Sequence, residues 1–310
     1  MLDAVIQCPI CEKSGYTPLV AQPEDYEYRI SIARTFQIFQ CTGCASRFLW
    51  PRPSIEELKS FYPKDYHAYY DEQGWIVGGL MSLRDKSRKE KYFTFTDHRP
   101  IRLFDVGCGN CRQFNTLRAG GGFQFSGVEI NSDMVAIALD NGYDVLEGTL
   151  EEMNLDKIEH SFDIVTMYQL VEHVLNPNLL FSQALRLLKP GGVVIGQLPC
   201  LDSLEARFFG QYWAGYHFPR HLQHFTRKSI SDCLARQGFD QIKVGTALHL
   251  QAALSLQNYI VGKLSPCNQL CHGKVGYYTY LLLAAAPFCC VEYVVGRGGM
   301  MNFFARSPKR

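Results

Sequence analysis

Short hydrophobic runs alternate with amphipathic segments over most of the chain that follows residue 100. Runs rich in β-branched and aromatic residues are typical of strands, whereas apolar positions three and four residues apart are typical of helices. The pattern predicts strands at 101–106, 124–130, 162–168, 193–198, 241–247 and 300–305. It predicts helices at 111–118, 133–140, 177–188 and 226–237. Strands that alternate with helices predict an α/β fold, a mostly parallel sheet wound with helices on both faces.

Local signals mark the ends of several of these helices. Asn176 followed by Pro177 is an N-cap with proline in the first turn, and Gly142 and Gly238 stand just beyond two predicted helix ends. Glycine is favoured there because it adopts the left-handed conformation without strain. The boundaries of the helices are therefore expected close to these residues.

The first 53 residues have a different pattern, with two pairs of cysteines around a tyrosine-rich, polar stretch. Strand-like patches occur at 28–32 and 35–39. Residues 54–98 are expected to form linker helices, because Ser54 and Glu57 have the spacing of a capping box. Residues 1–53 are expected to form a small separate module, and 99–310 the main domain.

The paired cysteines are Cys8-Pro-Ile-Cys11 and Cys41-Thr-Gly-Cys44. Two Cys-x-x-Cys knuckles give the spacing at which four thiolates reach one tetrahedral zinc ion. The alternative is four unligated thiols, but a module this small has too little core to hold itself. We therefore expect a zinc-ribbon-like module with a structural zinc, closed by four protein ligands and not catalytic.

Composition narrows the class of protein. The chain has 310 residues, of which 47% are hydrophobic and 20% charged, so a disordered or fibrous protein is excluded. The formal net charge of +1 gives no overall field for nucleic acid, which makes a nucleic-acid partner unexpected. The first of 12 cysteines stands at position 8, which leaves no space for a signal peptide, so we expect free thiols in a reducing cytoplasm.

Residues 275–291 carry no charge and approach the length of about 20 residues that spans a bilayer. Pro287, Glu292 and three tyrosines weaken that interpretation, and a single crossing would leave the strand at 300–305 on the wrong side. We expect a helical insertion at 249–297, buried or lying on the protein surface. Peripheral contact with a membrane through 275–296 stays open as an alternative.

The segment Phe104-Asp105-Val106-Gly107-Cys108-Gly109-Asn110 is a strand that leads through glycines into a predicted helix. Glycines there let backbone amides and a helix N-terminus approach a ligand. Glu129 ends the next strand, where a carboxylate can accept both hydroxyls of a ribose. A dinucleotide site would have glycine where Arg112 stands. Arg112 and Asp105 instead favour a cofactor with ribose, adenine and a zwitterionic amino-acid tail.

With its ordered motifs FDVGCGN, GVEI, GTLEE, FDIVTMYQLVEHVLNP and LLKPGG, the chain resembles the class I S-adenosylmethionine-dependent methyltransferases from about Ile101 to Ala247. The resemblance implies a seven-stranded Rossmann-like sheet whose last strand is antiparallel. It also implies a cofactor site, in which Cys111 replaces a frequent third glycine. The matching positions are Asp105, Gly107 and Gly109 under the methionine part, Glu129 at the ribose, Thr149 and Leu150 at the adenine, and Tyr168 and Gln169 beside the methionine tail and the substrate.

The knuckles and the segment CTGCASRFLWPRPSIEELKSFYPKDY also resemble the zinc-binding N-terminal part of some bacterial methyltransferases of sugar, glycan or natural-product pathways. The resemblances imply an S-adenosylmethionine-dependent methyltransferase for a small-molecule or glycan-linked acceptor. An RNA methyltransferase that grips nucleic acid with the zinc module is an alternative, although Met167-Tyr-Gln-Leu170 lacks the motif of adenine-N6 enzymes. A domain that binds the cofactor without catalysis is another.

Methyl transfer to a hydroxyl or carbon acid needs alignment and a proton acceptor, for which histidine is suited. His173 follows the strand at 162–168, and the expected substrate loop at 200–225 contributes His221 as the leading candidate, with His217 and His224 next. Each histidine could instead be structural. Arg220 could hold a phosphate or carboxylate of the substrate, or a neighbouring Asp. Some relatives hold a metal on Glu-x-x-Glu-His; Gln169 departs from that pattern, so no catalytic metal is expected.

Overall fold

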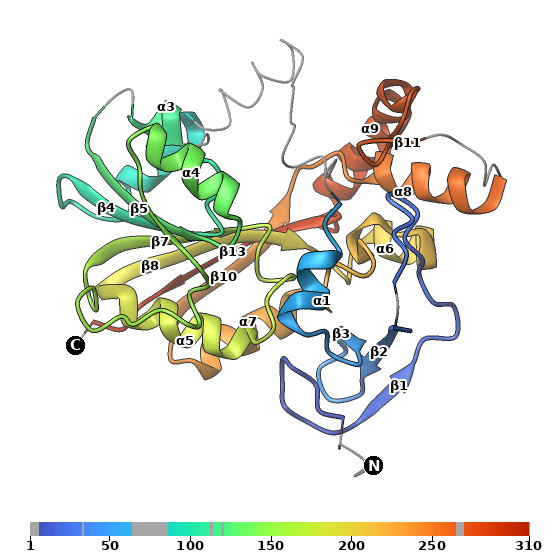
Figure 1. Ribbon diagram of the computed structural model, residues 1–310, viewed down its shortest axis with the longest axis horizontal. Helices are drawn as coiled ribbons and strands as arrows, with labels where there is room; N and C mark the ends of the chain where they lie inside the picture. The colour runs from blue at the N-terminus through green and yellow to red at the C-terminus, as the bar shows by residue number, and fades with distance from the viewer. Residues whose placement is uncertain are drawn as a thin grey trace.

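The computed structural model describes residues 6–32, 34–63, 86–111, 114–118, 121–264 and 270–309. Its centre is one large sheet with helices on both faces, and the N-terminal residues form a second, smaller sheet beside it (Figure 1). The α/β class expected from the sequence is confirmed.

The large sheet has seven strands, and its carboxyl edge is where a cofactor would bind. The strands are β4 (Ile101–Val106), β5 (Phe123–Glu129), β6 (Asp144–Glu147), β7 (Phe162–Tyr168), β8 (Leu188–Pro199), β10 (Asp240–Ala247) and β13 (Met300–Arg306). Their order in the sheet is β10-β13-β8-β7-β4-β5-β6. Strand β13 runs antiparallel to both of its neighbours, so the last strand does return to the sheet as expected.

Besides a helix at 86–93, described below, helices cover both faces of this sheet (Figure 1). They are α3 (Asn115–Arg118) and α4 (Ser132–Asp140) on one face, and α5 (Pro177–Leu187) and α7 (Arg227–Arg236) on the other. Asn176 caps α5 by accepting a hydrogen bond from the Leu179 amide, and Thr226 caps α7. The predicted starts of both helices are therefore confirmed, because the caps satisfy amides that have no partner within the helix.

The predicted helix at 111–118 is wrong at its beginning. Cys111 has a φ of +59°, and among the described residues the α-helix starts only at Asn115. A left-handed residue cannot continue a right-handed helix, and this conformation explains why glycine is frequent at the position. Strand β8 also begins earlier than the predicted Val193, because Leu188 already pairs with Phe162 of β7.

The small sheet is antiparallel and has the order β1-β2-β3-β9. The N-terminal residues supply β1 (Tyr16–Pro18), β2 (Gln37–Cys41) and β3 (Arg47–Trp50), whereas β9 (Gln223–His224) comes from the expected substrate loop. Arg47 of β3 pairs with His224 of β9. The module at 1–53 therefore shares its sheet with the main domain.

The strand expected at 28–32 is wrong for the described residues. The carboxylate of Asp25 accepts hydrogen bonds from the amides of Tyr28 and Ile30, at 3.1 Å each. An Asp that takes up backbone amides in this way holds a turn and competes with strand pairing.

The linker contains α1 (Ile55–Ser60), and the capping box between Ser54 and Glu57 is present as predicted. Residues 86–93 form a further helix, while residues 64–85 of the linker lie outside the described residues. Both side chains of the capping box satisfy backbone amides of the first turn, which the sequence spacing indicated.

The expected loop and insertion contain their own helices, grouped together at one end of the sheet (Figure 1). Residues 200–225 include α6 (Leu204–Phe209) and the 3-10 turns η3 (Gly210–Tyr212) and η4 (Ala214–Tyr216). The insertion includes α8 (Ala252–Tyr259), the π-helical turn η5 (Ile260–Leu264), the short strands β11 (Leu270–Cys271) and β12 (Lys274–Val275), and α9 (Tyr278–Val294). The expectation of a helical insertion is confirmed.

Candidate functional site

The glycine loop follows β4 at the carboxyl edge of the sheet. Gly107 and Gly109 have φ values of +71° and +55°, which glycine adopts without strain. A Cβ at Gly109 would meet no atom within 4 Å, so the space beside it is open, whereas a Cβ at Gly107 would stand 2.8 Å from Leu170. The loop thus presents bare backbone toward an open space, as a bound cofactor requires.

Glu129, at the end of β5, lies against this loop. Its two carboxylate oxygens accept hydrogen bonds from the amides of Gly109 and Asn131, both at 2.9 Å. Each oxygen keeps a further lone pair with which to accept a hydroxyl. The structure therefore brings together the acidic residue and the glycine turn that the sequence singled out.

Asp105 is nearly fully buried within β4, one strand away from β7. Thr166 of β7 donates a hydrogen bond to its carboxylate. This buried carboxylate lies two residues before the first glycine of the loop. Its negative charge can attract the backbone amides of the loop and a cationic group bound at the loop.

The two residues expected at the adenine have different environments. The Thr149 hydroxyl is half-buried and donates to the Glu152 carboxylate at 3.2 Å. The Leu150 side chain is fully buried in the main hydrophobic core. Of these two residues, therefore, only Thr149 has a side chain that is partly exposed and accessible to a ligand.

Tyr168 ends β7 and belongs to a small aromatic and basic group. Its hydroxyl is 2.8 Å from the hydroxyl of Tyr92, and the Arg88 guanidinium lies 3.9 Å from its ring centroid. Gln169, the next residue, is exposed and has a φ of +55°. Residues 86–93 thus contact the end of β7, and no local pattern in the sequence predicts this contact.

The four candidate histidines do lie together. The rings of His173 and His221 are 4.5 Å apart between centroids, His217 is 5.1 Å from His221, and His224 is 6.3 Å from His221. Burial lowers the pKa of His221 well below 6.5 and that of His173 to about 4. All of these side chains come from the turn after β7 and from the loop at 200–225.

One ring nitrogen of His221 makes a hydrogen bond to the backbone. Its Nδ1 lies 2.8 Å from the carbonyl oxygen of Gly215, and a carbonyl can only accept, so Nδ1 carries the proton. The neutral ring then has a bare lone pair on Nε2. This is the tautomer that a general base needs.

Glu172 stands beside these two histidines. Its side chain is almost fully buried, and among the described residues neither carboxylate oxygen has a hydrogen-bond partner. Desolvation raises its pKa to about 8. Ligand atoms of Glu172, His173 and His221 all lie within 4.8 Å of one another, so the three groups could share a proton or hold a divalent cation. The grouping does not include Gln169, on which the argument against a metal depended.

His217, His224 and Arg220 face other partners. Arg220 is fully buried and makes two hydrogen bonds to the carboxylate of Asp25, at 2.9 and 3.2 Å, so of the two expected roles the structure shows the pairing with Asp. His217 lies 3.0 Å from Glu27. Both contacts fasten the loop to the N-terminal module.

His224 belongs to β9 and is buried, with its Nε2 3.4 Å from the Tyr216 carbonyl oxygen. Burial lowers its pKa to about 3. Because a β-ladder and a backbone contact account for its position, His224 is the least suited of the four histidines to act on a substrate.

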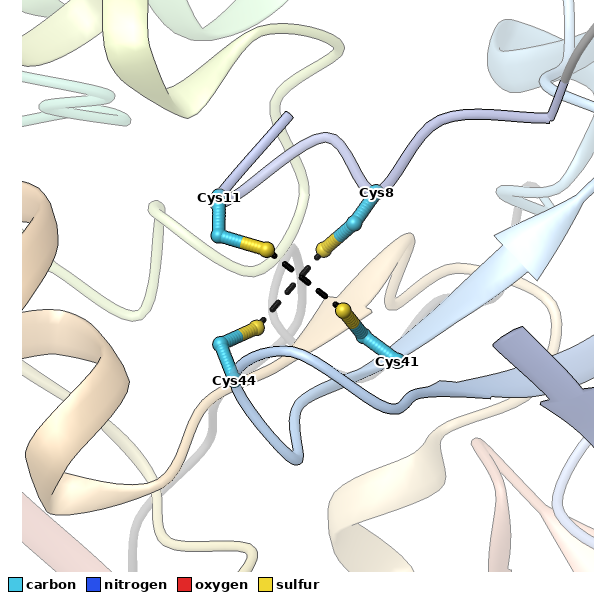
Figure 2. A group of neighbouring side chains, drawn as sticks. All are labelled: Cys8, Cys11, Cys41 and Cys44. Carbon is cyan, nitrogen blue, oxygen red and sulfur yellow. Dashed lines mark hydrogen bonds between the residues drawn. The ribbon is translucent and has the colours of Figure 1, made fainter. Parts of the chain in front are cut away.

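The four module cysteines form one cluster, with their sulfurs directed at a common centre (Figure 2). The Sγ atoms of Cys8 and Cys44 are 3.7 Å apart, and those of Cys11 and Cys41 are 3.4 Å apart. Zn–S bonds of about 2.3 Å in a tetrahedron put sulfurs about 3.8 Å apart. The donor type, number and spacing therefore fit a tetrahedral thiolate metal site.

Several residues that contact the candidate histidines or their loop were missed from the sequence. The Tyr62 hydroxyl lies 3.0 Å from His173 Nδ1, and Asp25 and Glu27 hold the loop from the module. Glu172 could have been found as an acidic residue directly beside a histidine at a strand end. Nothing in the local pattern around Asp25 or Glu27 indicated a partner almost 200 residues away.

Comparisons with known proteins agree with this geometry. The sequence profile of a family described as "Methyltransferase domain" matches residues 83–244, just over half of the chain. The ubiquinone biosynthesis O-methyltransferase of Burkholderia vietnamiensis is 32% identical over 98 residues, which are 30% of this chain and 42% of that protein. The ubiquinone/menaquinone biosynthesis C-methyltransferase of Rhodopseudomonas palustris is 32% identical over 31% of this chain and 41% of its own length. The chain thus spans about two fifths of each of these two relatives.

Among solved structures, the phosphoethanolamine N-methyltransferase 2 of Haemonchus contortus in complex with S-adenosyl-L-methionine superposes with a TM-score of 0.51 at 19% identity. The match covers 82% of this chain and 57% of that one, and it shows a shared fold. The profile match, the strand order with its antiparallel last strand, and the glycine loop all agree. The chain belongs to the class I S-adenosylmethionine-dependent methyltransferases.

Proposed function

We propose that the protein transfers the methyl group of S-adenosylmethionine to a small-molecule acceptor that must lose a proton. The observation that carries this proposal is the position of His221, whose Nδ1 carries the proton and whose ring lies 4.5 Å from that of His173 in the turn after β7. The carboxyl ends of β4 and β7 are neighbours, so the glycine loop and the turn that carries His173 come from the same edge of the sheet.

The residues divide the work between binding and proton transfer. Gly107 and Gly109 offer backbone, and Glu129 offers carboxylate lone pairs to a ribose. When bound, S-adenosylmethionine supplies an electrophilic methyl group on a sulfonium, which leaves as a thioether when an oxygen or carbon of the acceptor attacks in line. The proton from that oxygen or carbon passes to His221 Nε2.

The environment of His221 suits this step. Its lowered pKa keeps the ring neutral at physiological pH, so it can accept a proton. Glu172 is close enough to interact with the imidazolium that forms, and a nearby positive charge lowers the pKa of a carboxyl. Because the pKa of Glu172 is raised to about 8, its carboxyl is mostly protonated near pH 7, and only the ionised form, which the positive charge favours, can accept the proton from His221.

The same three groups would also fit a divalent cation, which would bind Glu172 and the two histidines and lower the pKa of an acceptor hydroxyl. The unpartnered oxygens of Glu172 are the observation that favours it. Assays with and without added Mg²⁺, Mn²⁺ and Zn²⁺ distinguish a metal-assisted reaction from one in which His221 alone is the base, because the second needs no metal ion.

The N-terminal cluster would serve a different purpose. Cys8, Cys11, Cys41 and Cys44 would hold a zinc ion as a structural staple, since all four ligands come from the protein and leave no open position. The module so stabilised presents Asp25 and Glu27 to the loop at 200–225. The zinc would thus keep the acceptor side in shape without touching the acceptor.

Support for the acceptor class comes from relatives. The names of the curated relatives place them in ubiquinone or menaquinone biosynthesis, and their acceptors are small molecules by those names. The resemblance of the N-terminal segment adds sugar-linked or glycan-linked acceptors to the compounds that should be tried.

The test uses S-adenosylmethionine with a labelled methyl group and a cell extract separated into small molecules, lipids, RNA and protein. Label is expected in the small-molecule or lipid fraction with wild-type protein and not with a His221→Ala variant that still binds the cofactor. Label confined to RNA or protein, or no label in any fraction, would contradict the proposal.

A further inference from the structure

Helix α9 exposes an apolar stripe along its outer side. Tyr280, Leu283, Val291 and Val294 are 73%, 69%, 57% and 82% exposed. At 3.6 residues per turn these four side chains project within an arc of about 80°. Phe208 of α6 is 75% exposed and packs beside α9, with its ring 5.8 Å from that of Phe288. These five residues are called the apolar face below.

The apolar face is held outward by the packing of the opposite side of α9. Leu281, Ala285 and Cys289 are buried in a cluster with α8. Glu292 is also buried, and its carboxylate accepts a hydrogen bond from the Glu205 amide at 2.5 Å. The helix cannot turn its apolar face inward without breaking these contacts and exposing a second apolar surface.

Charge is distributed unevenly around this helix. The insertion at 249–297 contains three basic residues, Lys263, Lys274 and Arg297, and a single acidic residue, the buried Glu292. Lys274 precedes α9, and Arg297 follows it with 56% of its side chain exposed. Asp202 lies 3.9 Å from Arg297 and also pairs with Arg227, so this group of three side chains is net basic. Arg207 is exposed directly before Phe208. The surroundings of the apolar face are therefore basic at both ends of the helix.

This combination selects one kind of occupant. In a symmetric contact with a second copy, the same patch faces itself, so basic ends would meet basic ends. An anionic lipid surface accepts apolar side chains into its acyl boundary and attracts basic residues beside them. Tyr280 and Tyr293, near the two ends of α9, are of the type enriched at such interfaces.

We propose that the apolar face binds the surface of an anionic lipid membrane, with α9 lying in the plane of the interface. Among the described residues, no helix is long and apolar enough to cross a bilayer. The contact is peripheral, and it takes its strength from buried apolar side chains together with attraction between basic residues and lipid phosphates.

The test measures flotation of the full-length protein with vesicles of phosphatidylcholine alone and of phosphatidylcholine mixed with phosphatidylglycerol. Wild-type protein is expected to float with the anionic vesicles, less so at high salt, and not with neutral ones. The variant carrying Leu283→Asp and Val294→Asp should bind about tenfold more weakly or worse, since each carboxylate removes apolar contact and is repelled by the lipid. Leu139→Asp on α4, at a position 52% exposed, is the matched control and should float like wild type.

A second measurement does not depend on removing the contact. Tyr280→Trp places a fluorophore on the apolar face, and its emission should shift to shorter wavelength and be quenched by brominated lipid when anionic vesicles are added. Equal flotation of wild type and the double aspartate variant would overturn the proposal. So would a wild-type protein that ignores anionic vesicles and instead forms a dimer that the double variant loses. None of these readouts needs methyl transfer, so they are independent of the proposed function.

Discussion

The cofactor side and the acceptor side of this site are built in different ways. The cofactor side consists of neighbouring strand ends, and Glu129 meets Gly109 only 20 residues earlier. The acceptor side is assembled from distant segments, because His217 meets Glu27 across 190 residues and Arg220 meets Asp25 across 195. A cofactor that a whole family uses can be bound by the same local motif in every member, whereas an acceptor that differs between members needs a binding site of its own. If this division holds, the two sides should respond separately to mutation.

The largest expected effect comes from the cysteine cluster. Cys41→Ser removes one of four thiolates from a kind of site whose zinc contributes about 10 kcal/mol or more to the folding of small zinc domains. Zinc should be lost, and turnover should fall about 100-fold or more as the loop loses Asp25 and Glu27. The affinity for S-adenosylmethionine should change by less than about threefold. Elemental analysis, calorimetry and turnover measure the three quantities.

Cys271→Ser is the matched control, because Cys271 is an exposed cysteine outside the cluster. It should leave zinc content and turnover unchanged. A Cys41→Ser protein that loses cofactor affinity and turnover together would show that the two sides are one unit.

The next largest effect tests whether His221 acts as a general base or has only a structural role. His221→Ala should lower kcat by about 10² to 10⁴, the range for loss of a general base, with unchanged cofactor affinity. His221→Asn retains a donor near the position of Nδ1, and so the contact with the Gly215 carbonyl, but has no Nε2. If both variants lose activity equally, Nε2 matters. Normal turnover in His221→Asn would leave His221 only a structural role.

On the cofactor side, Glu129→Ala should weaken S-adenosylmethionine binding by about 2 to 4 kcal/mol, because two hydrogen bonds from a ribose lose a charged acceptor. At saturating cofactor the variant should turn over nearly as fast as wild type. Glu129→Gln, which keeps one oxygen, should lie between the two in a calorimetric titration. An unchanged dissociation constant would refute the ribose assignment.

The pH profile sharpens the comparison further. Burial lowers the pKa of His221 below 6.5, so the base stays neutral as pH falls to that value, and the acid limb of kcat should lie below pH 6.5. Between pH 6.5 and 7.5 the rate should change by less than about twofold, since a group whose pKa lies well below 6.5 is mostly deprotonated over this whole range. A second inflection is expected near pH 8, where Glu172 ionises, and it should vanish in Glu172→Gln. An acid limb above pH 7 would exclude a buried neutral histidine as the base.

The smallest effect concerns the backbone of the glycine loop. Cys111 has a left-handed φ of +59°, which costs a residue with a Cβ about 1 kcal/mol relative to glycine. Cys111→Gly should change the free energy of unfolding by less than about 1 kcal/mol in urea titrations, because the relieved strain is offset by the loss of a side chain buried in the core, and it should leave cofactor affinity nearly unchanged. Gly142→Ala, at a φ of +74°, is the opposite control and should lower stability by a similar amount.

The same contrast decides how much could be predicted. Strands β4 and β7 were predicted to the residue, because each is a run rich in β-branched and aromatic residues with a sharp end. The glycine loop and Glu129 were also found, since a motif shorter than 30 residues contains both. The start of α3 was misjudged because the helical pattern was extended back to Cys111, although glycine is frequent at this position in the family and Cys111 takes a glycine-like conformation.

The acceptor side could be predicted only as a list of residue types. The histidines in the loop were conspicuous, but their partners were not, because Asp25, Glu27 and Tyr62 lie in segments with their own local explanations. The strand expected at 28–32 was lost for the same reason, since Asp25 forms a turn there. Long-range contacts of single side chains leave no periodic trace in a sequence.

The central claim is that the main sheet binds S-adenosylmethionine and that a zinc-binding N-terminal module holds the loop at 200–225 in place for the acceptor. Native mass spectrometry of the purified full-length protein tests it most directly, with and without S-adenosylmethionine, against the denatured mass. We expect the native mass to exceed the denatured mass by one zinc ion, and to rise by the mass of one cofactor when S-adenosylmethionine is added. A native mass equal to that of the bare chain, unchanged by the cofactor, would contradict it.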